Sequence, residues 1–387
     1  MPTKTLKLVA INVLVFFGLL LLIEAAGQVV ALARPSYDVL FMQPDKRVGW
    51  KQVPSFRFIW TGYDWYAAEF SVDVETSPLG FRDLAREYAK APGVSRVAVL
   101  GDSFIEAVQV PLPKTATQVL EQRLNALPDR DPSRSQKWEV LNFGVSNHGV
   151  GQYLLMWEEY ASRFHPDYVA IFVAKFHMRR TVSKYEYRAF TATRSKRLWV
   201  RPTFRIDHGS LVREPARDFD KFVEAQEALT RTEFAGSRIR RKPTQLVTLY
   251  YARFMWEEMG KQIRRAKEDQ AKGPKVVSSA EKDMIAVNLK VIEELGIKVS
   301  GGGGRMVVID ASQYFEDDPS VSRELSELCA KHGFGYVPVY HDLLKANASG
   351  IATRWTSDTH FNETGNRILA SSLYDWLARS ARAGKPQ

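Results

Sequence analysis

Short apolar runs alternate with amphipathic stretches over much of this chain, as strands and helices do when they alternate. The apolar runs predict five strands, at Val97–Leu100, Glu139–Phe143, Tyr168–Val173, Arg305–Asp310 and Gly335–Val339. Helical periodicity predicts helices at Pro113–Ala126, Gly151–Phe164, Pro319–His332 and Asn362–Ala378. Such alternation favours an α/β fold with three layers, in which helices cover both faces of a five-stranded parallel sheet.

The N-terminal end carries the longest apolar run. Leu8–Ile23 is almost unbroken. Together with the mostly apolar residues up to Ala33, it exceeds the ~20 residues needed to span a bilayer. Lys4 and Lys7 precede it, which favours a cytoplasmic N-terminus and an exported remainder. A cleaved secretory signal is the alternative, with Ala31–Ala33 as its A-x-A site. We predict an uncleaved transmembrane anchor over residues 1–34, because the apolar run is longer than the ~7–15 residues of a signal core.

Residues 35–90 are rich in aromatic side chains and are predicted to form a β-rich linker. Phe56 to Trp60 and Phe70 to Val74 alternate in polarity, with the turn-forming Gly62–Asp64 between them, so we expect an antiparallel hairpin. Its aromatic rings suit either stacking on sugar rings or packing of one face against the rest of the protein, with the remainder at the membrane interface. We favour packing, because buried aromatic rings contribute large apolar areas.

The alternation breaks at residues 181–300, where we predict a helical insertion between two parts of the α/β domain, 91–180 and 301–387. Its helices are expected at Phe219–Phe234, Thr244–Ala271 and Ala280–Leu295, and its basic run Arg238–Lys242 is typical of a solvated face. The insertion is either a cap over a pocket or a docking surface for a partner, and the pattern does not separate the two. Gly301–Gly304 precede a strand, and no lysine–serine pair follows them, so they predict a linker rather than a phosphate loop.

Composition narrows the classes of function. With 387 residues, 45% of them hydrophobic, the chain can form a substantial core. Its net charge is +10, but the basic residues are spread widely and no nucleic-acid motif is present, so we expect a basic surface near a membrane or an acidic polymer and no nucleic-acid partner. The single cysteine, Cys329, excludes an intrachain disulfide and is expected to be a buried thiol. The seven histidines lack metal-ligand spacing, so no metal or cofactor is predicted.

Two short stretches suggest a nucleophile and a base. Gly101–Phe104 (GDSF) directly follows the first predicted strand, which puts the Ser103 hydroxyl at the carboxyl edge of the sheet, where open α/β folds bind ligands. A serine hydroxyl is unreactive unless a base takes its proton. Near the C-terminus Asp358 and His360 are two residues apart, so in an extended segment or a turn they project the same way. His360 is therefore the candidate base, and Asp358 is the carboxylate that orients it.

Three blocks together resemble a known superfamily. GDSF after the first strand, NFGVSNHG (Asn142–Gly149) after the second and DTHFN before the last helix resemble the SGNH (GDSL-type) hydrolases, which include esterases, lipases and acyltransferases. The resemblance covers about residues 48–377. Gly49–Trp50 and Ser77–Arg82 are similar to segments that precede the serine block in membrane-anchored bacterial members.

The resemblance implies a flavodoxin-like fold and an acyl-enzyme mechanism. Ser103 would be the nucleophile, His360 the general base and Asp358 its orienting acid. The superfamily often has D-x-x-H, so the D-x-H spacing of this chain requires a different turn. Taken singly, each residue also fits a structural role, as a helix cap or a packed histidine. Their combination and order favour the catalytic interpretation.

The resemblance also implies an oxyanion hole with three donors, two of which are altered here. The first is the backbone N–H of Ser103. The usual glycine after the second strand is replaced by Asn147, whose N–H can serve because asparagine tolerates positive φ. The usual asparagine after the third strand is replaced by Phe176, which donates no hydrogen bond. Lys175 and His177 are the candidate substitute donors, although a packed or surface histidine is the interpretation we favour for His177.

Two functions of different classes remain. The first is a serine esterase or O-acyltransferase that is anchored in the inner membrane and acts, on the periplasmic side, on an acylated carbohydrate or cell-envelope polymer. Hydrolysis and transfer are not separated, although the apolar Phe176 beside the nucleophile weakly favours transfer by excluding water. The second is a catalytically weakened binding or scaffold subunit of a polysaccharide assembly or acetylation system, next to a membrane acyltransferase. We favour the enzyme.

Overall fold

The computed structural model describes residues 3–33, 41–64, 67–126, 137–189, 196–234, 278–356 and 358–383. The chain divides into two compact units. The first consists of Met1–Ser36, Thr191–Thr193 and Glu227–Val277, and the second of Tyr37–Phe190, Arg194–Gln226 and Ser278–Gln387. The second unit therefore contains both parts of the predicted α/β domain.

The first unit contains α1 (Thr3–Ala33), a helix that is apolar on all sides. Its segment Lys7–Gly27 has a mean hydropathy of 2.6 and is long and apolar enough to cross a membrane. Secretory signals also meet these criteria of length and hydropathy, so the helix fits both interpretations of the N-terminus.

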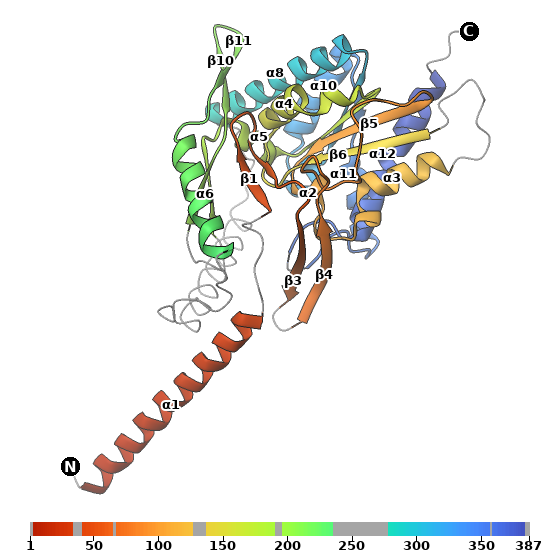
Figure 1. The fold of residues 1–387 in the computed structure, drawn as a ribbon. Coiled ribbons are helices and arrows are strands. Elements are labelled where there is room, and N and C mark those ends of the chain that lie inside the picture. Colours follow the sequence, from red (N-terminus) through yellow and green to blue (C-terminus); the bar gives the residue numbers. More distant parts are fainter. Residues whose placement is uncertain are drawn as a thin grey trace. The chain divides into compact units, whose positions relative to one another are not determined.

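The second unit is built on a five-stranded sheet in which every pairing is parallel, as predicted (Figure 1). Its strands are β5 (Val94–Gly101), β6 (Lys137–Gly144), β7 (Tyr168–Val173), β12 (Arg305–Asp310) and β13 (Gly335–Val337). The spatial order β13-β12-β7-β5-β6 is the flavodoxin-like order. The strand order reverses between β5 and β7, and such a reversal point is where open α/β sheets bind ligands.

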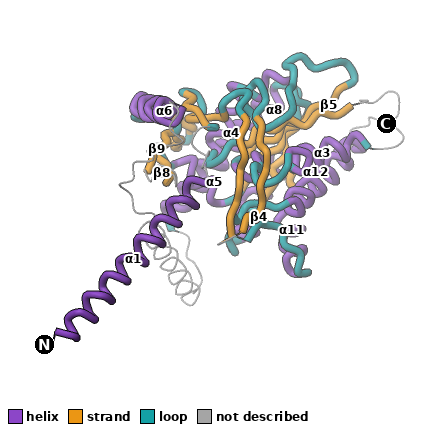
Figure 2. Tube along the Cα trace, turned by 60° about the horizontal axis from the view of Figure 1, so that its bottom comes forward, coloured by secondary structure: helices purple, strands orange, loops and turns teal. Residues whose placement is uncertain are grey.

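Helices cover both faces of the sheet, so the predicted three layers are confirmed (Figures 1 and 2). One face carries α3 (Ala116–Asn125), α11 (Val339–Ala348) and α12 (Glu363–Ala383); the other carries α4 (Val150–Glu159), α8 (Ser279–Gly301) and α10 (Pro319–His332). Both faces of the strands are buried: Val97 and Val99 pack toward α3 and α12, whereas Ala98 and Leu100 point the other way. This double burial explains why the strands read as continuous apolar runs. Cys329 on α10 is a buried thiol, as expected.

Short helices and turns complete the connections of the second unit. They are α2 (Ser103–Glu106), the 3-10 helices η1 (Leu112–Lys114) and η2 (Ala161–Phe164), α5 (Lys175–Val182) and α9 (Ser312–Phe315). The predicted helix Gly151–Phe164 is thus α4 followed by η2, and α5 and α11 were not predicted.

Two antiparallel hairpins precede the sheet. β1 (Met42–Asp45) pairs with β2 (Gly49–Gln52), which the sequence pattern did not predict. β3 (Arg57–Asp64) and β4 (Ala67–Glu75) form the predicted aromatic hairpin. The predicted turn at Gly62–Asp64 is wrong, because β3 continues past Gly62, where the register shifts. A Cβ at Gly62 would lie 2.3 Å from the Phe70 ring, so this glycine permits close cross-strand packing rather than a turn. Phe58, Phe70, Val72 and Val74 are buried, which agrees with the packing interpretation.

The prediction that residues 181–300 form a helical insertion is wrong in two respects. Its first part forms two antiparallel hairpins, β8 (Tyr185–Ala189) with β9 (Lys196–Val200) and β10 (Thr203–Asp207) with β11 (Ser210–Glu214). These strands are short and rich in charged residues, so they give no apolar run. Its last part, α8, connects β7 to β12 and packs on the sheet, so it belongs to the α/β core.

The other elements of this region have mixed outcomes. α6 (Phe219–Phe234) has the predicted bounds, whereas the predicted helix Thr244–Ala271 and the basic run Arg238–Lys242 lie outside the described residues. Gly301–Gly304 do not form a linker: Gly301 ends α8, and the Gly304 N–H donates to Val299 O at 3.0 Å, which closes the helix end tightly.

Candidate active site

Ser103 is the first residue of α2, immediately after β5, at the carboxyl edge of the sheet. Asp102 caps α2, because its Oδ1 accepts a 3.0 Å hydrogen bond from the Phe104 N–H. A Cβ at Gly101 would lie 2.2 Å from Ile105 Cγ1, so the turn requires glycine at this position. The sequence GDSF therefore builds a strand, a tight turn and a capped helix start, with the serine side chain 8% exposed at the reversal point of the sheet.

The structure brings Ser103, Asp358 and His360 together. His360 Nε2 lies 2.8 Å from Ser103 Oγ, and His360 Nδ1 lies 2.6 Å from Asp358 Oδ1. When Nδ1–H donates to the carboxylate, Nε2 is left to accept the serine proton. The His360 side chain is 26% exposed, so the pair of hydroxyl and imidazole is reachable from solvent. This arrangement is the one that makes an alcohol nucleophilic.

The short D-x-H spacing is accommodated by one residue in an unusual conformation. Thr359, between acid and base, has a φ of 69°, a left-handed conformation that β-branched residues rarely adopt. As a result Asp358 Oδ1 accepts from both the ring Nδ1 and, at 3.3 Å, the backbone N–H of His360. The Trp355 N–H donates to His360 O at 2.9 Å and closes the loop.

The β3–β4 hairpin holds this loop from outside. Glu69 of β4 accepts hydrogen bonds from the Thr356 N–H and, at 3.4 Å, from the Asp358 N–H. The adjacent Phe70 ring lies 5.1 Å from the Trp355 ring. Glu69 was not predicted from the sequence; its place on the polar side of an alternating strand is the only signal that it had. The hairpin therefore fixes the segment that carries the candidate acid and base.

If Ser103 and His360 act as nucleophile and base, replacing Glu69 by alanine is expected to lower the turnover number about 10- to 100-fold with little change in KM, because a loosened loop misplaces the imidazole. Steady-state hydrolysis of an activated acetyl ester measures both constants. Glu75→Ala is the matched control, since Glu75 is an exposed carboxylate farther along the same strand. If both variants lose activity equally, the loop contact has no specific role.

The three expected oxyanion positions differ in what they offer. Ser103 begins a helix, and the first N–H groups of a helix have no intrahelical acceptor, so its N–H is available for a ligand. Asn147 adopts a φ of 63°, the positive value that asparagine was expected to tolerate, in the turn after β6. Phe176 contributes no donor; its ring packs 5.2 Å from that of Phe315 and 6.2 Å from that of Phe104.

The two candidate substitute donors are engaged elsewhere. Lys175 Nζ forms ion pairs with Glu281 and Asp318, and its side chain is 4% exposed. His177 is fully buried, and its Nε2 lies 2.9 Å from Asp102 Oδ2. Burial lowers the pKa of His177, and its Nδ1 accepts from a backbone N–H, so the neutral ring presents its Nε2–H to the carboxylate. Neither Lys175 nor His177 is thus free to replace the asparagine, because carboxylates occupy both.

The structure adds one cation that sequence analysis missed. Arg180 Nη1 lies 2.8 Å from Asp102 Oδ2, on the same oxygen that faces His177. Burial acts to raise the pKa of Asp102, but His177 and Arg180 outweigh it and hold that pKa well below its usual range. Asp102 therefore remains a carboxylate next to the candidate nucleophile. The sequence signal for Arg180 is its position one helical turn after Phe176.

β2 hydrogen-bonds to α2 and to the segment Asn142–Gly149 that follows β6. The Trp50 Nε1–H donates to Ser146 O at 2.9 Å, and Trp50 O pairs with His148 Nε2 at 2.9 Å. Burial lowers the pKa of His148 to about 3, so this ring is neutral and donates to Trp50. Gln52 donates a hydrogen bond to the buried carboxylate of Glu106, the last residue of α2. The Gly49–Trp50 segment thus acts as a structural support of the site.

The segment Ser77–Arg86 provides a second support. The Arg82 guanidinium is fully buried and donates to the carbonyl oxygens of Glu106, Ala107 and Val110, which follow Ser103. It thereby fixes the end of α2, the helix that begins with Ser103, and the turn that follows it.

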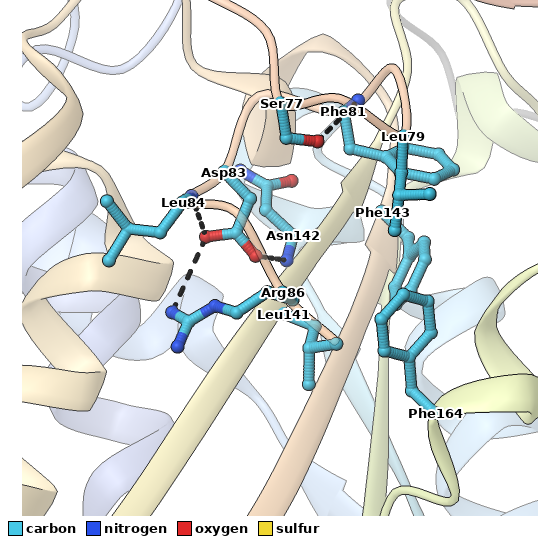
Figure 3. A pocket seen from close by; sticks show the side chains of 10 residues that line it. All are labelled: Ser77, Leu79, Phe81, Asp83, Leu84, Arg86, Leu141, Asn142, Phe143 and Phe164. Atoms are coloured by element: carbon cyan, nitrogen blue, oxygen red, sulfur yellow. Dashed lines mark hydrogen bonds and ion pairs between the residues drawn. The ribbon is translucent and has the colours of Figure 1, made fainter. Parts of the chain in front are cut away.

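Beside Arg82, Asp83 lines a small void. Its carboxylate accepts from the backbone N–H groups of Leu84 and Asn142 and faces Arg86 (Figure 3). Burial raises the pKa of Asp83 to about 7, against the opposing effect of Arg86. The void has a volume of about 10 Å³, which admits at most one water molecule and no substrate.

A larger hollow, of about 280 Å³, lies against the loop of the candidate acid and base. Thr359, which stands between Asp358 and His360, is part of its wall. The lining combines two aromatic side chains with mostly polar ones: Tyr314, Asn347, Ala352, Thr353, Arg354, Trp355, Thr356 and Thr359. A hollow of this composition offers mainly hydrogen-bonding groups next to the candidate acid and base.

Comparison with known proteins gives matches at the level of structure. No family model matches the chain, and no curated protein sequence matches it. An α/β hydrolase from the metagenome of Lake Arreo, Spain, is similar with a TM-score of 0.40 at 13% identity, covering 75% of this chain and 97% of that one. A lipase/acylhydrolase from Enterococcus faecalis gives 0.38 at 11%, covering 74% and 96%. An acetylxylan esterase from Geobacillus stearothermophilus gives 0.37 at 11%, covering 73% and 94%. Similarity of this degree does not define a function, which has to be argued from the site itself.

Proposed function

We propose that this protein is a serine esterase or O-acyltransferase of the SGNH type, with Ser103 as nucleophile, His360 as general base and Asp358 as the orienting acid. The observation that carries the proposal is the contact of 2.8 Å between Ser103 Oγ and His360 Nε2, continued by 2.6 Å from Nδ1 to Asp358. A chance packing of three polar residues would not also put the hydroxyl at the reversal point of a parallel sheet.

The mechanism follows from these positions. Ser103 Oγ attacks the ester carbonyl carbon, and its proton passes to His360 Nε2. The tetrahedral intermediate collapses, the ester C–O bond breaks, and the leaving alkoxide takes the proton from His360. Water or the hydroxyl of an acceptor then attacks the acyl-serine in the same manner and regenerates the free serine. Hydrolysis and transfer differ only in this second nucleophile.

We propose an acylated carbohydrate or cell-envelope polymer as the substrate, acted on outside the cytoplasm by a protein anchored through α1 in the inner membrane. The hollow beside Thr359 supports a sugar ligand, because most of its lining side chains are polar and can hydrogen-bond sugar hydroxyl groups. The helix Lys7–Gly27 and the lysines before it support anchoring with an exported domain. A membrane acyltransferase is a proposed partner that would supply acyl groups.

The test uses the full chain in detergent. We expect a fluorophosphonate to label it once, at Ser103, and the chain to cleave p-nitrophenyl acetate and to release acetate from, or transfer acetyl to, acetylated sugars. Mass spectrometry locates the label, and acetate release compared with acetyl transfer to added sugars separates hydrolysis from transfer. Absence of both labelling and turnover would reject the enzyme and favour the alternative of a binding or scaffold subunit, which the missing asparagine donor at Phe176 motivates.

A further inference from the structure

The proposed reaction leaves one electrostatic requirement open. When Ser103 attacks, negative charge develops on the carbonyl oxygen, and donors fixed in advance around that oxygen usually make the largest contribution to catalysis. Phe176 supplies no donor where an asparagine was expected, and Lys175 and His177 are occupied by carboxylates. A third donor has to come from another side chain that reaches the serine.

Arg180 reaches the region where the three motif blocks meet. It follows Phe176 by four residues on α5, so the two side chains share one face of the helix. Its guanidinium carbon lies 5.0 Å from the centre of the Phe176 ring. Its Nη1 contacts Asp102 Oδ2 at 2.8 Å and donates to His148 O at 3.2 Å. The guanidinium therefore touches the segments that follow β5, β6 and β7.

The guanidinium is also close to the candidate nucleophile. Asp102 Oδ2, which pairs with Arg180 Nη1, lies 3.5 Å from Ser103 Oγ. Both contacts share Asp102 Oδ2. The distance from Ser103 Oγ to Arg180 Nη1 therefore cannot exceed the sum of these two distances.

Donors remain available on Arg180. The hydrogen bonds of Arg180 to Asp102 and His148 both use Nη1, and within the described part of the chain neither Nη2 nor Nε has a hydrogen-bond partner. The side chain is 21% exposed, so it faces the open side of the site rather than the core. A guanidinium presents its N–H groups in a rigid fork, which suits a developing oxyanion.

The local backbone makes room for this arginine. A Cβ at Gly149 would lie 2.7 Å from Arg180 Cβ and 2.8 Å from His177 O. Glycine at the start of α4 therefore lets α5 approach closely enough for Arg180 to reach Asp102. This packing of the start of α4 against α5 is independent of the ion pair.

Asp102 and His177 hold the guanidinium in place. The Ala174 N–H donates to His177 Nδ1 at 2.9 Å, so the neutral ring carries its proton on Nε2, which lies 2.9 Å from Asp102 Oδ2. His177 Nε2 and Arg180 Nη1 thus both contact Asp102 Oδ2, at 2.9 and 2.8 Å. Asp102 and His177 therefore act as positioning residues for Arg180.

We propose that Arg180 is a catalytic residue that donates to the oxyanion in place of the missing asparagine; the proposal rests on the proposed esterase or acyltransferase function. As the bond from Ser103 Oγ to the carbonyl carbon forms, the carbonyl π electrons move to oxygen, and the free N–H groups of Arg180 bind the oxygen together with the Ser103 N–H. When the C–O bond to the alcohol breaks, the carbonyl reforms and these hydrogen bonds weaken.

The test compares variants of the full chain in detergent with p-nitrophenyl acetate. Arg180→Gln is expected to lower kcat about 100- to 1,000-fold with KM changed by no more than about threefold, since the donor acts in the transition state. Fluorophosphonate labelling of Ser103 should slow in parallel, because it builds up charge on an equivalent oxygen. Arg179→Gln is the control: Arg179 is the preceding residue of α5, 51% exposed and paired with Glu316.

Two further measurements separate catalysis from structure. Arg180→Lys retains a positive charge beside Asp102 without the fork, and we expect an unchanged melting temperature with kcat reduced about 10-fold or more. Millimolar guanidinium chloride is expected to restore part of the activity of Arg180→Ala and none of the activity of a Ser103→Ala chain.

The outcomes are distinct for the two proposals. If the wild-type chain neither hydrolyses the ester nor is labelled, the proposed function fails. If the wild type is active and Arg180→Lys and Arg180→Gln, both folded, stay within threefold of it, only the role of Arg180 is overturned. The role of Arg180 is also overturned if Arg180→Gln has a lowered melting temperature, Arg180→Lys is fully active and guanidinium rescues nothing. These results would show that Arg180 forms a structural ion pair.

Discussion

Replacing Ser103 by alanine is expected to abolish ester cleavage, with a loss in kcat on the order of a million-fold, because the variant retains the binding groups and loses the atom that forms the acyl-enzyme. Only Ser103 Oγ lies within hydrogen-bonding distance of His360 Nε2 among the described residues, so no neighbouring hydroxyl substitutes for it. Hydrolysis of p-nitrophenyl acetate and fluorophosphonate labelling both measure the effect. The melting temperature should change little, since one oxygen atom is removed without leaving a large cavity.

The control for this variant is Ser349→Ala, at the exposed end of α11, which should keep both activity and labelling. Activity that persists in the Ser103→Ala chain would show that another group attacks the substrate. A wild-type chain that is inactive, but whose cellular role survives the Ser103→Ala change, would favour the binding subunit instead.

The second large effect is on stability. Arg82→Ala is expected to destabilise the second unit by more than about 4 kcal/mol, because it leaves the carbonyl groups of Glu106, Ala107 and Val110 buried without their donor. Burial lowers the pKa of Arg82 to about 10, so the guanidinium is still charged at neutral pH and its hydrogen bonds are charge-assisted. Such a loss is comparable to the whole stability of many domains. Denaturant titration followed by tryptophan fluorescence measures it.

Arg57→Ala serves as the comparison for Arg82. Arg57 forms an ion pair with Asp73 on the surface of the β3–β4 hairpin, where its side chain is 69% exposed, so its loss should leave the melting temperature unchanged. Equal melting temperatures for the two variants would mean that the buried guanidinium does not hold the serine loop.

The central sheet could be predicted from the sequence because its strands are buried on both faces. Val97–Leu100 and Tyr168–Val173 are continuous apolar runs, and β7 and β12 have the predicted bounds. The candidate triad was predictable for a different reason. Each of its parts lies in a short local motif, GDSF at a strand end and D-x-H before a helix, so the sequence identifies the groups even though only the fold brings them together.

The remainder depended on partners that local sequence does not encode. The hairpin strands β8 to β11 are short and charged, so periodicity gives no signal for them. Lys175 and His177 were candidate donors in the sequence, although a packed or surface position was favoured for His177. In the folded chain His177 is buried beside Asp102, as that interpretation expects, and Lys175 pairs with Asp318. Glu69 contacts a loop almost three hundred residues away, which pattern analysis along the chain cannot detect.

The contacts of β2 and of the segment Ser77–Arg86 with the candidate site extend the N-terminal boundary of the functional unit. Residue 91 marks the start of the α/β domain in the sequence pattern, but Trp50, Gln52 and Arg82 all bond to the serine block or its neighbour from positions ahead of that boundary. A shortened form that contains only the sheet and its helices would leave the carbonyl groups that follow Ser103 without their contacts to Arg82. For expression without α1, the cut therefore belongs before Phe41, so that the first hairpin stays attached to the site that it supports.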